Sequence, residues 1–173
     1  MKITLIWSSA NTDGLTAKVK NSIVKGIEKN CKISEFYLNK MNLHHCIACK
    51  NGFGLCKEEG KCVLYDDFEK IYQSLCECDK IIFVTAVYWH DVTEQMKVIL
   101  DRLRRIEASH NHYLKEKDAI IVSVAGGSGK GVTECLVKLE ETLSHMEINC
   151  VERIGITRRN AESRMSILKG LEI

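Results

Sequence analysis

The sequence predicts an α/β fold in which a parallel β-sheet carries helices on both faces. Short runs rich in β-branched and aromatic residues alternate with longer stretches in which apolar residues recur every three or four positions. This alternation is typical of parallel strands joined by helical crossovers. In addition, loops rich in glycine, hydroxyl-bearing or aromatic residues follow three of the runs, which is where such sheets bind ligands.

Five runs are predicted to be strands, and they are Lys2–Trp7, Lys32–Leu38, Lys80–Thr85, Asp118–Val124 and Ile148–Ile156. Right-handed crossovers with helices on both faces allow few strand orders, and 2-1-3-4-5 is a common one. We therefore expect a doubly wound five-stranded parallel sheet in this order. Residues 39–65 form a long connection without a convincing period, whereas roughly 2 to 6 residues would join the neighbouring elements.

The apolar residues of each predicted helix form one stripe that can pack on the sheet. The stripes are Leu15, Val19, Ile23 and Ile27; Phe68, Ile71, Tyr72 and Leu75; Val92, Met96, Ile99, Leu100 and Leu103; and Val132, Leu136, Leu139 and Leu143. Asp91 and Glu94 are expected to form a capping box for the third helix. A last helix is expected from about Asn160 to Leu171.

The composition indicates one globular domain, residues 1–173, of ordinary size. Its 25 basic and 23 acidic residues give a net charge of +2, which argues against a nucleic-acid partner. No apolar run approaches the roughly 18 residues of a membrane-spanning helix, and the first apolar stretch is too short for a signal peptide. We therefore expect a cytoplasmic protein without membrane contact. The basic residues Arg102, Arg104 and Arg105 share a helix with Asp101 and Glu107 and are expected to form a solvated face.

The predicted strand order brings together the loops at residues 8–14, 86–90 and 125–131. The first loop supplies hydroxyl groups, an amide at Asn11, and Gly14, which lets the backbone turn into a helix. Free N–H groups and the dipole at a helix start favour a phosphate. An ordinary helix cap with polar neighbours explains the same residues equally well.

The other two loops differ in character. The sequence AGGSGKG is glycine-rich, but Val124 and Gly131 stand where a Walker motif needs glycine and serine or threonine. A dinucleotide fingerprint would belong after the first strand, so this loop is expected to let a flat ring approach the backbone. Tyr88 and Trp89, at the end of the third strand, indicate contact with a ligand or a subunit, or they cover the sheet edge.

Four segments together resemble the NAD(P)H-dependent FMN reductase and iron–sulfur flavoprotein families, which are flavodoxin-like. The segments are SSANTDGLTAK, CIACKNGFGLCKEEGKCVLYDDF, AVYWHDVTEQMKVILDRLRR and AGGSGKG. The resemblance spans nearly the whole chain, and the second and third segments are the most specific. The chain departs from these families in having Ala10 and Asn11 where proline and arginine are frequent, and Ala86 where proline is frequent.

What this resemblance implies is a bound FMN that accepts hydride from NAD(P)H. Its phosphate is implied to lie at the first loop, on Ser9, Asn11, Gly14, Leu15 and Thr16. Its ribityl chain and ring are implied to lie against Ala86, Val87, Tyr88, Trp89, Gly126, Gly127, Ser128 and Gly129. No side chain is expected to act as acid or base, because the flavin supplies the redox chemistry.

The leading functional interpretation is an oxidoreductase that reduces a quinone, a nitro compound, free flavin or an electron-transfer partner. Two alternatives stay open: a flavin and iron–sulfur electron carrier without a small-molecule substrate, and a flavin-free metal-binding or regulatory module on the same fold. A homodimer or homotetramer is expected, because Tyr88 and Trp89 would leave apolar surface at a cleft mouth.

The chain has nine cysteines, an odd number that argues against a fully paired disulfide framework. Cys46, Cys49, Cys56 and Cys62 fall within the long connection with the spacing C-x2-C-x6-C-x5-C. Four soft ligands in one loop suit an iron–sulfur cluster or a tetrahedral zinc ion. The cluster-binding relatives have a tighter motif, so packing residues or relics of a lost cluster are the alternative. We expect the other five cysteines to be mostly inert core residues.

Overall fold

The computed structural model describes residues 1–52 and 54–169, which form a five-stranded parallel sheet in the order β2-β1-β3-β4-β5. The strands are β1 Lys2–Ser8, β2 Lys32–Tyr37, β3 Lys80–Ala86, β4 Asp118–Ala125 and β5 Asn149–Thr157. Strands β1, β3 and β4 are almost wholly buried, whereas the outer strands β2 and β5 expose much of their length. The predicted α/β fold, its strands and their order are confirmed.

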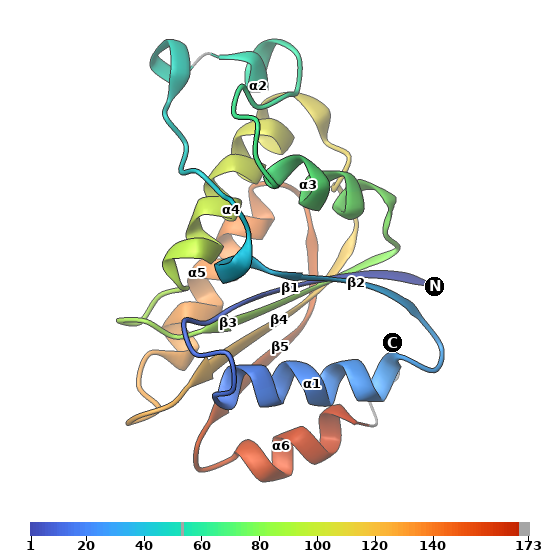
Figure 1. Ribbon diagram of the computed structural model, residues 1–173, viewed down its shortest axis with the longest axis vertical. Helices are drawn as coiled ribbons and strands as arrows, with labels where there is room; N and C mark the ends of the chain where they lie inside the picture. The colour runs from blue at the N-terminus through green and yellow to red at the C-terminus, as the bar shows by residue number, and fades with distance from the viewer. Residues whose placement is uncertain (53, 170–173) are drawn as a thin grey trace.

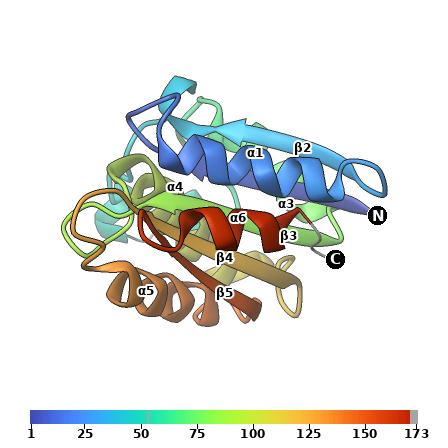
Figure 2. The same cartoon turned by 90° about the horizontal axis from the view of Figure 1, so that it is seen from below.

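Helices cover both faces of this sheet (Figure 1). On one face lie α1 Leu15–Ile27 and α6 Ala161–Leu168, seen in front of the sheet in Figure 2. On the other face lie α3 Phe68–Glu77, α4 Glu94–Ile106 and α5 Val132–Ser144. Alternate strand residues enter the two cores: Phe83 packs with α3, α4 and α5, while Val84 packs with α1 and α6.

The expected capping box at the start of α4 is wrong. Thr93 is the N-cap of this helix, and its hydroxyl accepts a hydrogen bond from the Met96 N–H at 3.3 Å. Asp91 instead lies in the preceding turn, where its carboxylate is 3.0 Å from the Lys138 ammonium. A threonine cap satisfies the same orphan N–H groups two residues later than the sequence pattern suggested. The predicted last helix is confirmed as far as Leu168, and its expected end at Leu171 lies outside the described residues.

The long connection between β2 and α3 contains only short helical turns in its described part. These are η1 Leu38–Lys40, η2 Cys49–Gly52 and α2 Leu55–Glu58. Figure 1 shows the connection rising away from the sheet to α2, which lies beyond the C-terminal end of α4. There α2 contacts both α4 and the π-helical turn η3 Glu107–Asn111.

The expectation of a fully solvated basic face on α4 is also wrong. Arg104 is exposed, but Arg102 is 2% exposed and Glu107 is fully buried. Arg102 pairs with Asp66, and Glu107 accepts hydrogen bonds from the Tyr72 hydroxyl and the Leu114 N–H. Arg102 is buried where the long connection, which carries Asp66, folds over the end of α4, whereas Glu107 is enclosed by α3 and the loop after η3. Among the described residues, no helix is long and apolar enough to cross a membrane.

Candidate functional site

The loop after β1 is held in place from beneath by residues of β2 and η1. Asn39 Oδ1 accepts hydrogen bonds from the Ser8 hydroxyl at 2.9 Å and from the Ser9 N–H at 3.0 Å. The Tyr37 hydroxyl donates to the Ser9 carbonyl at 2.9 Å, and its ring stacks on Trp7 with centroids 3.9 Å apart. The loop is therefore preorganised rather than free to collapse onto the helix that follows it.

The start of α1 has the features of an anion site. Gly14 occupies the N-cap position and gives no side-chain hydrogen bond, and the first turn contains no acidic residue. The Asn11 amide oxygen accepts from the Asp13 N–H at 3.1 Å and so does not cap the helix. First-turn N–H groups without a side-chain cap attract a phosphate. Thr16, which belongs to this turn, is 4% exposed.

The loops after β1, β3 and β4 lie side by side at the carboxyl edge of the sheet. The Ala10 N–H donates to the Tyr88 hydroxyl at 3.0 Å, which joins the first loop to the second. The Val87 N–H donates to the Val124 carbonyl at 2.9 Å, which joins the second to the strand that precedes the third. Beneath them the hydroxyls of Ser8 and Thr93 hydrogen-bond to each other.

Residues 88–91 form a tight two-residue turn with an unusual backbone. The N–H and carbonyl groups of Tyr88 and Asp91 bond to each other in both directions, at 2.9 and 3.1 Å. Trp89 and His90 both adopt positive φ, 50° and 66°, where Asn-Gly is the usual pair. Two bulky residues in this conformation store strain, and such strain clusters at binding sites. Trp89 projects outward and is 96% exposed.

The third loop offers bare backbone on one side and tight packing on the other. A Cβ added at Gly126 or Gly127 would meet nothing within 4 Å. At Gly129, which has φ +78°, a Cβ would lie 2.9 Å from the Thr157 side chain. At Gly131, φ is +84° and a Cβ would lie 2.8 Å from His90 Cα. The loop is thus fixed at its second half and open at its first, where a flat ring has room to approach.

The structure brings every sequence-predicted flavin residue to this one edge. They are Ser9, Asn11, Gly14, Leu15, Thr16, Ala86, Val87, Tyr88, Trp89, Gly126, Gly127, Ser128 and Gly129. An uncapped helix start beside open glycines fits a ligand with a phosphate at one end and a planar ring at the other. Sequence reasoning missed Asn39, Tyr37 and Thr93, although Asn39 follows a strand at this edge and so carried a positional signal.

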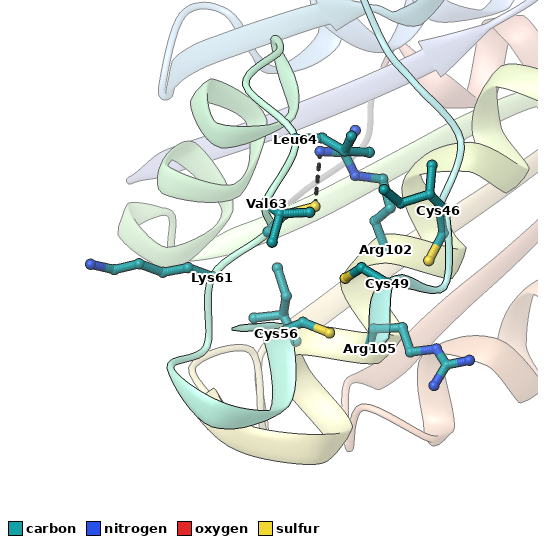
Figure 3. Close-up of a pocket in the computed structure, with 11 residues that line it drawn as sticks. Cys46, Cys49, Cys56, Lys61, Val63, Leu64, Arg102 and Arg105 are labelled. Carbon is teal, nitrogen blue, oxygen red and sulfur yellow. Dashed lines mark hydrogen bonds between the residues drawn. The ribbon is translucent and has the colours of Figure 1, made fainter. Parts of the chain in front are cut away.

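A second candidate site lies at the other end of α4. Cys46, Cys49, Cys56 and Cys62 line one pocket together with Arg102. Figure 3 shows the sulfur atoms of Cys46, Cys49 and Cys56 turned toward the pocket, and the hydrogen bond from Arg102 to the sulfur of Cys62. All four thiols are partly buried and free. Although their spacing in the sequence is unusual, the four cysteines thus line one pocket in the fold.

Tight backbone geometry helps the four cysteines to converge. Ala48, Lys50 and Asn51 adopt left-handed conformations that turn the chain sharply around Cys49. A Cβ added at Gly54 would overlap Cys49 Sγ, so the absence of a side chain at Gly54 allows this close approach. These turns explain how the extended spacing between Cys49 and Cys56 is accommodated.

The thiols lie within electrostatic reach of one another. Burial raises the pKa of Cys56, and the neighbouring thiols of Cys49, Cys46 and Cys62 raise it further. A bound cation would reverse this effect, because metal coordination stabilises thiolates. The donor set therefore fits a thiolate-bound centre.

The described thiols are not arranged as a preformed site for a single metal ion. In residues 1–52 and 54–169, no three His, Cys, Asp or Glu side chains lie close enough to hold one metal ion. Sulfurs at about 2.3 Å from a tetrahedral zinc ion would lie within about 4 Å of one another. A cluster contains its own iron and sulfide, so its cysteine ligands stand farther apart.

The two candidate sites are linked by a single helix. Helix α4 begins just after Thr93, which hydrogen-bonds to Ser8 at the carboxyl edge, and its last turns carry the arginines of the cysteine pocket. The nine residues from Thr93 to Arg102 correspond to roughly 14 Å along a helix axis. The cysteine pocket is thus about one helix length from the sheet edge, although its connection leaves β2 beside the first loop.

The sheet order and its flanking helices define this protein as a flavodoxin-like α/β protein, with a ligand edge at the point where the strand order reverses. Comparison with known families then identifies it further. The chain belongs to the NADPH-dependent FMN reductase family, whose model matches residues 1–162. By family it is an FMN-dependent oxidoreductase that uses NAD(P)H.

The individual curated relatives that match this chain are also flavoproteins by name. An iron-sulfur flavoprotein of Methanocaldococcus jannaschii is 31% identical over 134 residues, which cover 77% of this chain and 67% of that protein. An iron-sulfur flavoprotein of Methanosarcina thermophila is 27% identical over 82% of this chain and 72% of its own length. This chain covers only 65% and 57% of the length of two other curated relatives. The chain thus spans about two thirds, or less, of several of its curated relatives.

The solved structure of an NAD(P)H:quinone oxidoreductase from Methanothermobacter marburgensis is similar in fold. It superposes with a TM-score of 0.76 over 98% of this chain and 94% of that chain, at 15% sequence identity. At this identity the likeness shows the fold alone.

Proposed function

We propose that this protein is an NAD(P)H-dependent oxidoreductase of the cytoplasm that binds one FMN at the carboxyl edge of the sheet and reduces a small acceptor. The observation that carries the proposal is the uncapped start of α1 beside the open backbone of Gly126 and Gly127. When bound, FMN would supply the transfer of hydride and electrons. The chain's own groups would bind and orient it through Ser9, Asn11 and the first turn of α1.

The acceptor is proposed to be a quinone, a nitro compound or free flavin. An open, solvent-exposed edge flanked by Tyr88 and Trp89 suits a planar aromatic acceptor, because aromatic side chains stack on such rings. Mixing the FMN-loaded protein with NADPH or NADH under anaerobic conditions should bleach the flavin absorbance within seconds, and a quinone should restore it. Reduction by dithionite but not by either nicotinamide would instead indicate an electron carrier.

A second candidate function follows from the cysteine pocket. The convergence of Cys46, Cys49, Cys56 and Cys62 on one pocket favours an iron–sulfur cluster, which would exchange single electrons with a redox protein partner. The relatives named iron-sulfur flavoproteins support the same proposal. The two functions are compatible, because a flavin accepts electrons in pairs and a cluster passes them on singly. A flavin-free regulatory module is disfavoured by the family to which the chain belongs.

We further propose that the protein is a homodimer or a homotetramer, in which a second subunit covers the tip of the Tyr88–Asp91 turn. Trp89 is 96% exposed although it is the largest apolar side chain of the turn, and such a residue is enriched at subunit contacts. Trp89→Glu should shift the protein to monomers in light scattering at micromolar concentration. Tyr113→Glu, at another exposed aromatic residue, is the matched control. A monomeric wild-type protein would refute the proposal.

A further inference from the structure

We infer that the guanidinium of Arg102 sets the charge balance under which the four-cysteine centre accepts an electron. The inference rests on the proposed iron–sulfur centre and concerns a residue of α4 that has no place in the cysteine motif. Its guanidinium lies on the same pocket as the four cysteines. Arginine stays protonated in proteins, so its charge is permanent.

The hydrogen bonds of Arg102 fix the direction in which its charge points. Nη1 donates to Asp66 Oδ2 at 2.6 Å and to the His44 carbonyl at 3.0 Å, while Nη2 donates to Asp66 Oδ1 at 2.9 Å. This two-pronged contact with the carboxylate leaves the second hydrogen of Nη2 to point at Cys62 Sγ, 3.4 Å away. The ring of Phe68 supports the guanidinium at 4.1 Å. Asp66 therefore holds Arg102 with one edge toward the sulfur.

The ion pair itself is fully formed over the physiological pH range. Burial opposes ionisation of Asp66, but hydrogen bonds from Arg102 and from the N–H groups of His44 and Phe68 lower the pKa of its carboxyl to about 2. Both side chains are at most 1% exposed. Burying two charges costs desolvation free energy, so a buried ion pair is weak evidence for added stability. A role at the cysteine pocket is therefore the better explanation for this pair.

One donor of Arg102 has no acceptor. Its Nε is buried and makes no hydrogen bond within the described part of the chain, while its other four N–H groups all have partners. A buried donor without an acceptor costs free energy, and this one belongs to a side chain that lines the cysteine pocket. An electron-rich sulfur centre in the pocket is the kind of acceptor that this donor lacks.

The charged residues around the pocket support the same role for Arg102. Among the described residues, those that line the pocket include the cations Lys61, Arg102 and Arg105 and no carboxylate. Figure 3 shows Lys61 extending away from the cysteines, and Arg105 donates to the Gly52 carbonyl at 3.3 Å. Arg102, in contrast, donates a hydrogen bond directly to a thiol of the pocket. The Asp66 carboxylate lies on the other side of the guanidinium and partly offsets its charge.

Two variants of this pair, one single and one double, should shift the reduction potential of the centre in opposite directions. One-electron reduction adds one negative charge and breaks no bond, with dithionite as the electron donor in the titration. Asp66→Asn removes the offsetting carboxylate and should raise the potential. The double variant Arg102→Met/Asp66→Asn keeps an apolar side chain of similar length and leaves no buried carboxylate unpaired. It should lower the reduction potential by about 59 mV, which is a tenfold change in the equilibrium constant of one-electron reduction.

Arg104→Met is the matched control, because Arg104 is exposed on the same helix and carries the same charge. Its potential should equal that of the wild type. Iron and acid-labile sulfide are measured in every variant alongside the potential. Shifts in the same direction, or no shift, at wild-type iron content would overturn the inference. If Asp66→Asn lost the centre, the ion pair would have a structural role, and the inference would be overturned as well. An iron-free wild-type protein would instead contradict the proposed centre itself.

Discussion

Asn11→Asp should weaken FMN binding on the order of 100-fold. The substitution is isosteric and keeps an oxygen to accept from the Asp13 N–H, but it places a carboxylate at the proposed phosphate site before α1. A like charge about 5 Å from a phosphate at an effective dielectric constant of about 20 costs roughly 3 kcal/mol, and 1.4 kcal/mol corresponds to a tenfold change in affinity. Isothermal titration calorimetry of FMN into the apo-protein measures the effect.

Asn21→Asp is the matched control for this experiment. Asn21 is exposed on α1, the same helix, but lies well beyond the first turn. Its affinity for FMN should stay within about twofold of the wild type, because exposed charges at that distance are largely screened. Thr16 and Ser9 are less suitable targets, since both are buried and their replacement would disturb packing. Equal affinities for the two variants would show that the phosphate does not bind at this helix start.

Alanine at any one of Cys46, Cys49, Cys56 and Cys62 should abolish most of the bound iron. The wild-type protein, purified anaerobically, should contain iron and acid-labile sulfide in equal amounts, up to about four of each per chain if the cluster is a cubane. A cluster that loses one of four thiolate ligands is exposed to solvent and degrades. Iron and sulfide analysis together with the visible absorbance of the cluster would report the loss.

Cys150→Ala is the control for the cysteine series. Cys150 is also partly buried, but it lies in β5, at the opposite edge of the sheet from β2, which the connection leaves. It should retain full iron content, and the melting temperatures of all variants should show that the fold is intact. Stoichiometric zinc without sulfide in the wild type would indicate a structural metal site instead. Four titratable free thiols at these positions and no metal would contradict both forms of the proposal.

The sequence by itself determined the sheet, its strand order and the edge that we propose as the ligand site. Strands such as β3, predicted as Lys80–Thr85, were recognisable because a parallel strand buried on both faces is a continuous apolar run. The position of the loops around Asn11, Tyr88 and Gly126 then followed from the strand order alone, since the carboxyl ends of parallel strands share one edge. These features depend on patterns of local residues and on few allowed topologies.

Only the tertiary structure decided which polar groups are buried and what they face. Arg102 lies three residues after Ile99 and four before Ile106, on the apolar face of α4, yet its charge suggested a solvated position. Its burial depends on Asp66, 36 residues away in the chain, and no periodic pattern encodes a partner at that separation. In the same way the spacing of the cysteines allowed a shared centre, but the left-handed turns around Cys49 brought their sulfurs to one pocket. The local periodicity of apolar residues specifies helices and strands, whereas long-range packing decides which distant side chains meet.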